Sequence, residues 1–348
     1  MRVKDLIISE INKKGKIDIS EFINLSQYGD SGYYIKQNPI GLNNDFITAP
    51  EVSQMFGEIV GLFILNYWQN KIGTSYNLIE LGPGRGSLIS DILRVGNINK
   101  KYIDSINLTL IEKNEKLINL QKKSLKDIGF DKVTWQEEFK IQKKNIPSII
   151  YSNEFFDCFS VRQFYKKKKW IEKFIKYNSA NNLFNFTEDE VNDKKILKKL
   201  EQFDKIKVAE LSSSRKNYFD KVCKFIKRNK GIFLTIDYGY KKPPNYLTLQ
   251  TIYNHKKTHL FENIGNQDIT AHVNFNELIN VAKNNELKLE IYCSQKDFLM
   301  SCGIEQRKEK LKINKNQKDI ETLNLEVDRL TNKSKMGEIF KVLVVSCL

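Results

Sequence analysis

Residues 77–86 read NLIELGPGRG, and this stretch decides the fold. A short apolar run stops at three glycines placed at alternate positions, and apolar residues at helical spacing follow from Ser87 onward. The pattern predicts a strand, a glycine turn and a helix. Glycines in such a turn allow positive φ angles and let a ligand approach the main chain closely. A tight turn without a ligand is the simpler alternative.

A second apolar run, residues 107–111, ends in Glu112. An acid at the carboxyl end of a parallel strand can accept hydrogen bonds from both hydroxyls of a ribose. The two stretches together therefore predict a nucleoside site. The nucleoside is the next question, because dinucleotide folds use G-x-G-x-x-G, whereas the spacing here is G-x-G-x-G. Glu80 stands just before the glycines, where it would repel a pyrophosphate but attract a cation. We therefore expect S-adenosylmethionine, with a nicotinamide dinucleotide as the alternative.

Composition excludes several other classes of protein. The chain has 348 residues and a formal net charge of +15, but its lysines are spread among polar residues without an arginine-rich, aromatic stripe. We therefore expect no nucleic-acid partner. Five widely spaced cysteines without a C-x-x-C argue against a disulfide framework and a zinc site. No apolar run is long enough for a signal peptide or a membrane span. We expect a bacterial cytoplasmic protein, with the mitochondrial matrix as the alternative.

The remaining patterns predict an α/β chain. Residues 1–27 have apolar spacing typical of two short helices, 28–48 resemble an irregular loop over the ligand crevice, and a helix should begin near Pro50. Alternation over 161–186 predicts strands, with Lys166–Lys169 as an exposed turn. Residues 194–199 should begin a charged linker, and 241–272 should be loop. Further strands are expected at 133–135, 147–151, 208–211, 231–236, 287–292 and 339–347, and further helices at 115–128, 216–226, 274–283 and within 296–329.

Six blocks of sequence occur in a characteristic order: DFITAPEVSQMFGE at 45–58, ELGPGRGSLISDILR at 80–94, SNEFFDCFSVRQF at 152–164, IDYGY at 236–240, DITAHVNF at 268–275 and MGEIFKVL at 336–343. Together they resemble the MidA family of S-adenosylmethionine-dependent methyltransferases, whose mitochondrial members act in assembly of respiratory complex I.

The resemblance implies a Rossmann-like class I methyltransferase fold, with a seven-stranded, mostly parallel sheet and helices on both faces. It implies an N-terminal helical extension with a cofactor-covering loop over 1–72 and a core over 73–348. Within the core, substrate-facing insertions are expected at about 158–207, where the sequence is β-rich, and 241–272. For the mitochondrial members it implies methylation of a protein arginine, so the expected partner is a protein substrate, with a complex I subunit as one candidate.

The predicted cofactor residues lie at the ends of successive strands. An acid or amide at 136–138 could bind the adenine amino group, and we choose Glu137 while leaving the others open. The complete predicted set is Glu80, Gly82, Pro83, Gly84, Gly86, Glu112, Glu137 and Asn153.

The predicted catalytic residues are mostly acids, because a guanidinium stays charged and needs carboxylates to grip it and localise its charge. Glu154 is the first choice, since it follows the strand at 147–151, where methyltransferases acting on amino groups generally keep such residues. The others are Asp157, Glu210 and Asp237, with His272 as a proton shuttle. Capping a helix or holding a turn is the alternative for each acid. An assembly factor that keeps the cofactor site, or a methyltransferase with another acceptor, are the alternative functions.

Overall fold

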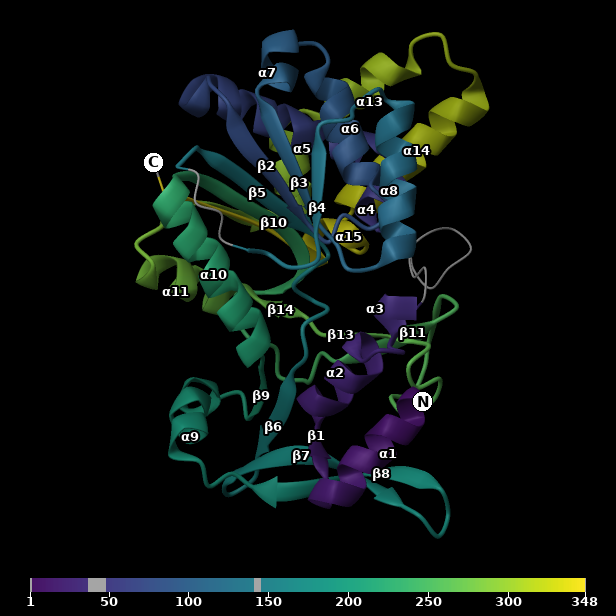
Figure 1. Ribbon diagram of the computed structural model, residues 1–348, viewed down its shortest axis with the longest axis vertical. Helices are drawn as coiled ribbons and strands as arrows, with labels where there is room; N and C mark the ends of the chain where they lie inside the picture. The colour runs from purple at the N-terminus through teal and green to yellow at the C-terminus, as the bar shows by residue number, and fades with distance from the viewer. Residues whose placement is uncertain (1, 37–47, 141–144, 348) are drawn as a thin grey trace. The chain divides into compact units, whose positions relative to one another are not determined.

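The computed structural model describes residues 2–36, 48–140 and 145–347 (Figure 1). The chain divides into two compact units, and each unit is assembled from three separate stretches. Unit 1 comprises Met1–Phe46, Phe156–Tyr218 and Tyr240–Asn276, and unit 2 comprises Ile47–Phe155, Phe219–Gly239 and Glu277–Leu348.

A large mixed sheet organises unit 2 (Figure 1). Seven of its eight strands follow one another in the order β15-β16-β10-β5-β2-β3-β4. Neighbours from β10 to β4 run parallel, whereas β16 is antiparallel to both β10 and β15. The expected α/β class with a large central sheet is confirmed. These strands are β2 (Tyr76–Leu81), β3 (Ile106–Ile111), β4 (Val133–Gln136), β5 (Ser148–Asn153), β10 (Gly231–Tyr240), β15 (Lys288–Ser294) and β16 (Phe340–Cys347).

Helices cover both faces of this sheet because alternate strand residues point in opposite directions. Leu78 and Tyr151 share the main apolar cluster with residues of α5 and α6. On the opposite face, Phe233 of β10 packs on Phe219 of α10, with ring centroids 5.3 Å apart. The helices of unit 2, or largely of it, are α4 (Ala49–Val52), α5 (Gln54–Tyr67), η1 (Trp68–Ile72), α6 (Ser87–Gly96), α7 (Lys100–Asp104), α8 (Glu115–Asp127), α10 (Ser213–Asn229), α11 (Phe275–Asn284), α12 (Gln295–Ser301), α13 (Ile304–Lys312), α14 (Gln317–Thr331) and α15 (Met336–Ile339).

The helix expected from Pro50 onward is interrupted. The backbone of Ser53 is extended, with φ −158°, so α4 ends there and α5 begins with the next residue. The Ser53 hydroxyl accepts the N–H of Met55 at 3.2 Å and thereby caps the new helix. Residues 1–72, expected as one extension, contribute α1 to α3 to unit 1 and α4, α5 and η1 to unit 2. Much of the expected cofactor-covering loop, residues 37–47, lies outside the described residues.

Unit 1 contains a five-stranded sheet with β1, β7, β6 and β9 in that order and β8 paired to β7. The strands predicted from alternation at 161–186 are confirmed, and the lysine run lies between β6 and β7. The helices and strands of this part are α1 (Val3–Lys14), β1 (Ile17–Asp18), α2 (Ile19–Tyr28), α3 (Tyr33–Lys36), β6 (Arg162–Lys166), β7 (Trp170–Asn178), β8 (Leu183–Glu190), α9 (Lys194–Leu200), η2 (Glu201–Phe203) and β9 (Val208–Leu211).

Two predictions about unit 1 are wrong. Residues 241–272, expected as loop, contain the antiparallel sheet β12-β11-β13, and β14 follows. Its strands are too short for any periodicity to be recognised. The expected charged linker is helix α9, which begins because the Asp193 carboxylate accepts the N–H groups of Lys195 and Ile196. The strands are β11 (Gln250–Tyr253), β12 (Lys256–Lys257), β13 (Asp268–Thr270) and β14 (Val273–Asn274).

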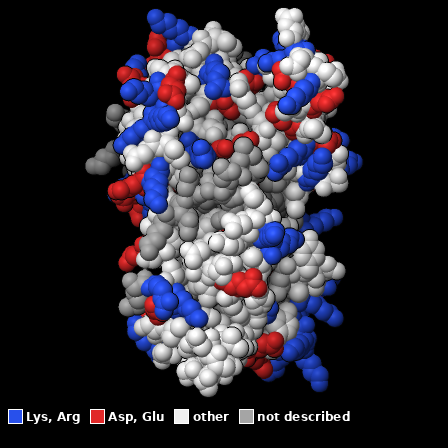
Figure 2. Space-filling model, turned by 90° about the vertical axis from the view of Figure 1, so that its right-hand side faces the viewer, with Lys and Arg blue, Asp and Glu red and all other residues white. Residues whose placement is uncertain are grey.

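Charged side chains of both signs occur on the surface. On the face shown in Figure 2, lysine and arginine side chains alternate with aspartate and glutamate rather than forming one continuous basic stripe. None of the helices in the described ranges is long and apolar enough to cross a membrane.

Candidate cofactor site and neighbouring acids

The glycine turn connects β2 to α6, as predicted. Gly82, Gly84 and Gly86 all have positive φ angles, of 64°, 53° and 85°. The amide nitrogen of Gln121 on α8 donates to the Gly84 carbonyl at 2.7 Å, and the Trp135 indole donates to the Gln121 side-chain oxygen at 2.9 Å. The shape of the turn is therefore fixed by side chains from α8 and β4. Pro83 completes the turn, because its carbonyl accepts the N–H of Gly86 at 2.8 Å.

Glu80 lies directly before this turn and is almost completely buried, with 2% of its surface exposed. Its Oε2 accepts the hydroxyl of Tyr151 at 3.0 Å. No lysine or arginine of the described ranges lies within ion-pair distance of it. Burial raises the pKa of Glu80 to about 8, and the neighbouring charge of Glu112 contributes in the same direction. A cationic ligand would offset this cost of burial.

The other predicted cofactor residues lie at the same edge of the sheet. Ile111 pairs with Leu81 and Gln136 pairs with Ile111, so the residues that follow the three strands are brought together. Oε1 of Glu112 accepts the N–H groups of Lys113 and Asn114 at 2.8 and 2.9 Å. Burial raises the pKa of Glu112 as well. Glu137 directly follows β4, and its side chain is exposed.

Asn153 ends β5 and provides a direct test of whether a cofactor fits. Its side-chain nitrogen donates to Glu154 at 3.1 Å, whereas its buried Oδ1 has no hydrogen-bond partner among the described residues. Buried polar atoms are normally paired, so this oxygen is available to a donor from a ligand. S-adenosylmethionine fits this donor and charge pattern: its ammonium and sulfonium suit Glu80, its ribose hydroxyls suit Glu112, and its amino groups can donate to Asn153.

Two of the predicted acids lie near the carboxyl ends of β5 and β10: Glu154 directly follows β5, and Asp237 lies within β10, three residues before its end. Glu154 adopts a left-handed backbone conformation with φ 48°, and its Oε1 accepts the N–H of Ala49 at 3.1 Å. Asp237 is completely buried, and its two oxygens accept the N–H groups of Phe155 at 3.2 Å and Tyr238 at 2.9 Å. The structure thus places one carboxylate on the loop after β5 and another in the adjacent strand β10, near the carboxyl ends of both strands.

The other predicted catalytic residues belong to unit 1. Asp157 and His272 are brought near each other because Arg215 donates to the Phe156 carbonyl at 2.7 Å and to the His272 carbonyl at 3.3 Å. The Asp157 carbonyl also accepts the N–H of Ala271 at 3.0 Å. Burial lowers the pKa of His272, so its neutral form is favoured near pH 7.

Glu210 has a different environment within unit 1. Its Oε1 accepts the side chain of Gln163 at 2.8 Å and the N–H of Leu249 at 3.1 Å. Its Oε2 accepts both the N–H of Thr248, at 3.0 Å, and the Thr248 hydroxyl. This carboxylate therefore holds β9 to the segment before β11.

Arg215, Gln121 and Tyr151 were not identified from the sequence. Each acts on a partner 37 to 71 residues away, namely Phe156, Gly84 and Glu80. No local motif marks such residues. Arg215 stands out only in the structure, because it is a cation that is 2% exposed.

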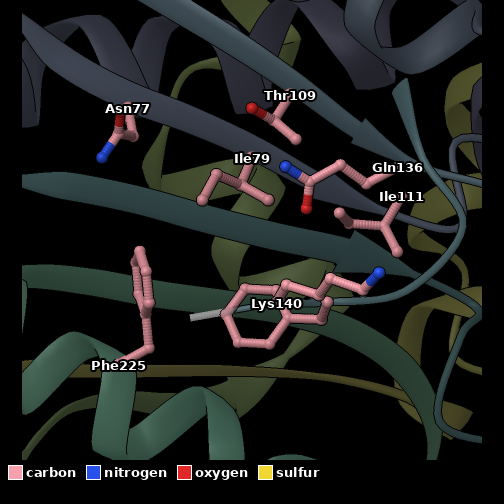
Figure 3. A pocket seen from close by; sticks show the side chains of 8 residues that line it. Asn77, Ile79, Thr109, Ile111, Gln136, Lys140 and Phe225 are labelled. Atoms are coloured by element: carbon pink, nitrogen blue, oxygen red, sulfur yellow. The ribbon is translucent and has the colours of Figure 1, made fainter. Parts of the chain in front are cut away.

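A pocket beside the sheet is separate from these residues. Figure 3 shows side chains of β2, β3 and β4 pointing toward Phe225 of α10. Gln136, an open candidate for the adenine contact, is among them, whereas none of the eight chosen cofactor residues is. Because Ile79 and Asn77 alternate with Leu78 and Glu80, the pocket lies on the face opposite α6. Within the described part of the chain, no group of three or more His, Cys, Asp and Glu side chains could hold a metal ion.

Comparison with known proteins identifies the family of the chain. A family model described as "Putative S-adenosyl-L-methionine-dependent methyltransferase" matches residues 59–293. Two relatives are named mitochondrial protein arginine methyltransferases: the NDUFAF7 homolog of Caenorhabditis elegans and NDUFAF7 of Homo sapiens. The first is 28% identical over 97% of this chain and 86% of its own. The second is 27% identical over 96% of this chain and 81% of its own.

A solved structure shares the fold over nearly the whole chain. A protein from Burkholderia thailandensis, crystallised with S-adenosyl-homocysteine, has a TM-score of 0.88 at 24% identity. The match covers 99% of this chain and 92% of that one.

Proposed function

The chain belongs to the family of S-adenosyl-L-methionine-dependent methyltransferases, and from this premise we propose that it methylates the guanidinium of an arginine in a protein substrate. The observation that supports the proposal is that Glu154, on the loop after β5, and Asp237, in the adjacent strand β10, lie near the carboxyl edge of the sheet and are linked through the N–H of Phe155. The names of the relatives from Caenorhabditis elegans and Homo sapiens support an arginine acceptor. The resemblance to the MidA family supports a complex I subunit as the substrate.

The proposed chemistry is an in-line displacement, for which the bound cofactor supplies a methyl group on a sulfonium. The protein has to position one guanidinium nitrogen opposite that carbon and exclude water. A guanidinium has a pKa above about 12, so carboxylates must bind its charge and leave electron density on the attacking nitrogen. Glu154 performs this role in the proposal. Asp237 holds the backbone of the same loop through the N–H of Phe155.

The predicted catalytic residues of unit 1 have less support than Glu154, and they differ among themselves. His272 is suited to receive the proton that leaves the methylated guanidinium, because burial favours its neutral imidazole. Asp157 is a second candidate for contact with the acceptor, since Arg215 holds the carbonyl of the preceding residue. Glu210 has the weakest case, because four hydrogen bonds already engage its carboxylate.

Two alternatives remain as outcomes of the test. The first is an assembly factor that binds the cofactor but transfers no methyl group, and the second is a methyltransferase with a different acceptor. The proposed cofactor set of Glu80, Glu112, Glu137 and Asn153 would serve either. For the location we propose the bacterial cytoplasm, or the mitochondrial matrix if the source is eukaryotic.

The test is methyl transfer by the full chain, using S-adenosylmethionine labelled on its methyl group and a cell extract as the source of acceptors. Mass spectrometry should find the label on arginine side chains of a protein. Glu154→Gln should lower turnover by at least about a hundredfold, the scale expected of a positioned acid or base, with cofactor affinity within a few-fold.

The matched control is Glu286→Gln, which changes an acid of the same unit whose side chain is 78% exposed. Its turnover should equal that of the wild type. Label on another residue type would favour the second alternative, and binding without transfer would favour the assembly factor. Normal turnover in Glu154→Gln would move the acceptor site away from this loop.

A further inference from the structure

Helix α4 connects two loops of the site that lie far apart in the sequence. Its first N–H, that of Ala49, donates to Oε1 of Glu154 on the loop after β5, at 3.1 Å. Its single acid, Glu51, accepts the hydroxyl of Ser87 at the start of α6, at 2.7 Å. The helix thus contacts both the proposed catalytic acid and the end of the glycine turn.

The contact with Ser87 lies where α6 lacks a cap of its own. The N-cap residue of α6 is Gly86, which has no side chain to accept an N–H of the first turn. A carboxylate is favoured at the N-terminus of a helix because the unpaired N–H groups carry partial positive charge. Glu51 supplies that carboxylate from another helix. It therefore fixes Ser87, the residue that immediately follows the last glycine of the cofactor turn.

The contact with Glu154 fixes the direction of its carboxylate. Oε1 accepts hydrogen bonds from the N–H of Ala49 and from the side chain of Asn153, both at 3.1 Å. Glu154 has a strained backbone, with φ 48°. Such conformations are unfavourable for residues other than glycine and persist where surrounding contacts hold them. The N-terminus of α4 is one of these contacts.

We propose that Glu51 is a positioning residue for methyl transfer. Through Ser87 it holds the glycine turn in its cofactor-binding shape, and through α4 it keeps Ala49 in contact with Glu154. The same short helix thereby aligns the cofactor site with the acceptor site. The part that concerns Glu154 rests on the function proposed above. Glu51 touches neither cofactor nor acceptor in this role.

A purely stabilising role for Glu51 is the competing explanation, and other anchors of α4 make the two separable. The helix is also held by the completely buried Ala49 and by the Ser53 hydroxyl, which donates to Glu326 of α14 at 2.7 Å. Removal of the bond between Glu51 and Ser87 should therefore leave the unit folded and expose its effect on binding.

The experiment measures the affinity for S-adenosylmethionine and S-adenosyl-homocysteine by titration calorimetry, together with turnover at saturating cofactor. Ser87→Ala and Glu51→Ala should each weaken both ligands about tenfold, the scale of a lost hydrogen bond to a charged group. The double variant should be no weaker than either single variant, since all three lack the same bond. Ser87→Thr and Glu51→Gln keep a hydroxyl donor and an oxygen acceptor, and both should bind within about threefold of the wild type.

The matched control is Ser105→Ala. The Ser105 hydroxyl also makes one hydrogen bond, to the Tyr102 carbonyl at 2.7 Å, but it lies at the amino end of the strands. This variant should bind both ligands normally, whatever its thermal stability. Affinity in Ser87→Ala equal to that in Ser105→Ala would overturn the proposal, as would a Glu51→Gln variant as weak as Glu51→Ala. Binding needs no acceptor, so this result stands even if arginine methylation is not found.

Discussion

Two buried glutamates, one in each unit, have similar burial but different numbers of hydrogen-bond partners. Glu80 of unit 2 is 2% exposed and Glu210 of unit 1 is 8% exposed. Among the described residues, Glu80 accepts one hydrogen bond, from Tyr151, whereas Glu210 accepts four, from Gln163, Thr248 and Leu249. Burial alone therefore does not distinguish a binding residue from a structural one.

The difference lies in what compensates the buried charge. N–H and O–H donors within unit 1 pair both carboxylate oxygens of Glu210, as buried polar groups require. Glu80 lacks this compensation in the described part of unit 2, and its pKa is raised to about 8 because of burial. Its charged form is thus best stabilised by a cation that arrives from outside. If the comparison is right, the loss of cofactor affinity should be largest for a substitution in the glycine turn and smallest for one at Glu210.

The largest expected effect is that of Gly82→Val. A Cβ at Gly82 would lie 2.7 Å from Cδ2 of Phe155, and its φ of +64° disfavours any side chain. The turn and the loop that carries Phe155 would both have to move, so affinity for S-adenosylmethionine should fall at least about a hundredfold. Calorimetry would measure this loss.

Gly73→Val is the matched control for backbone strain. Gly73 has a φ of +65°, and among the described residues nothing lies within 4 Å of the position that a Cβ would occupy there. The variant should lose stability and keep cofactor affinity. Equal loss of affinity in the two variants would show that strain, rather than the shape of the turn, controls binding.

The turn and its strands could be predicted because their signals are local. An apolar run that ends in alternate glycines predicted β2 and α6, and acids directly after strands predicted Glu112 and Glu154. The parts that were missed depend on distant partners or on very short elements. Tyr151 pairs with a residue 71 positions away, and β11 to β13 have four residues or fewer, too few for a periodic pattern.

Roles within unit 1 were harder to predict for the same reason. In the sequence, Glu210 looks like Glu154, since each is an acid at or just after the end of a short strand. Only the structure shows that Glu210 faces Thr248 and Leu249, residues from a segment that was expected to be loop. The donor set around an acid is a property of the packed unit and leaves no local mark in the sequence.

Glu80→Gln should have the next largest effect, and the effect should depend on pH. The pKa of Glu80 is about 8 without a ligand, and a bound cation favours the charged form. Wild-type affinity should therefore rise by up to about tenfold per pH unit below pH 8 and level off above it. Gln cannot ionise, so the variant should show no such rise and should bind about thirtyfold more weakly at pH 9.

Stability gives a second readout for Glu80. In the unfolded chain the pKa of Glu80 is about 4.3. Between roughly pH 4.5 and 8, Glu80 is therefore protonated in the folded protein and ionised in the unfolded protein. Unliganded wild type should lose stability as pH rises through this window, and Glu80→Gln should lack this contribution. A wild-type affinity independent of pH between 6 and 9 would contradict the role assigned to Glu80.

Glu112→Gln should have a smaller effect. Its Oε1 already accepts the N–H groups of Lys113 and Asn114, and the amide oxygen of Gln can accept them too. Only the charge-assisted hydrogen bonds to the ribose should weaken, so affinity should fall about tenfold at a pH where Glu112 is charged. The control ligand is 2′,3′-dideoxy-S-adenosyl-homocysteine, which lacks both hydroxyls, so its affinity should differ little between wild type and variant. A full tenfold difference for this ligand would mean that Glu112 acts elsewhere.

Glu210→Gln should have the smallest effect on the cofactor and a clear effect on stability. The amide group would present N–H groups to a site that holds donors from Gln163, Thr248 and Leu249, so at least one donor would lose its acceptor. A buried unsatisfied donor costs about 1 to 3 kcal/mol of unfolding free energy, measurable by urea denaturation. Glu188→Gln, which removes an exposed ion pair with Lys167, should cost less than about 1 kcal/mol. Affinity for S-adenosylmethionine should stay within about twofold in both variants, because compensated acids have no need of an external cation. If Glu210→Gln instead weakened cofactor binding as strongly as Glu80→Gln, the number of internal donors around a buried acid would not separate ligand-binding from structural carboxylates in this protein.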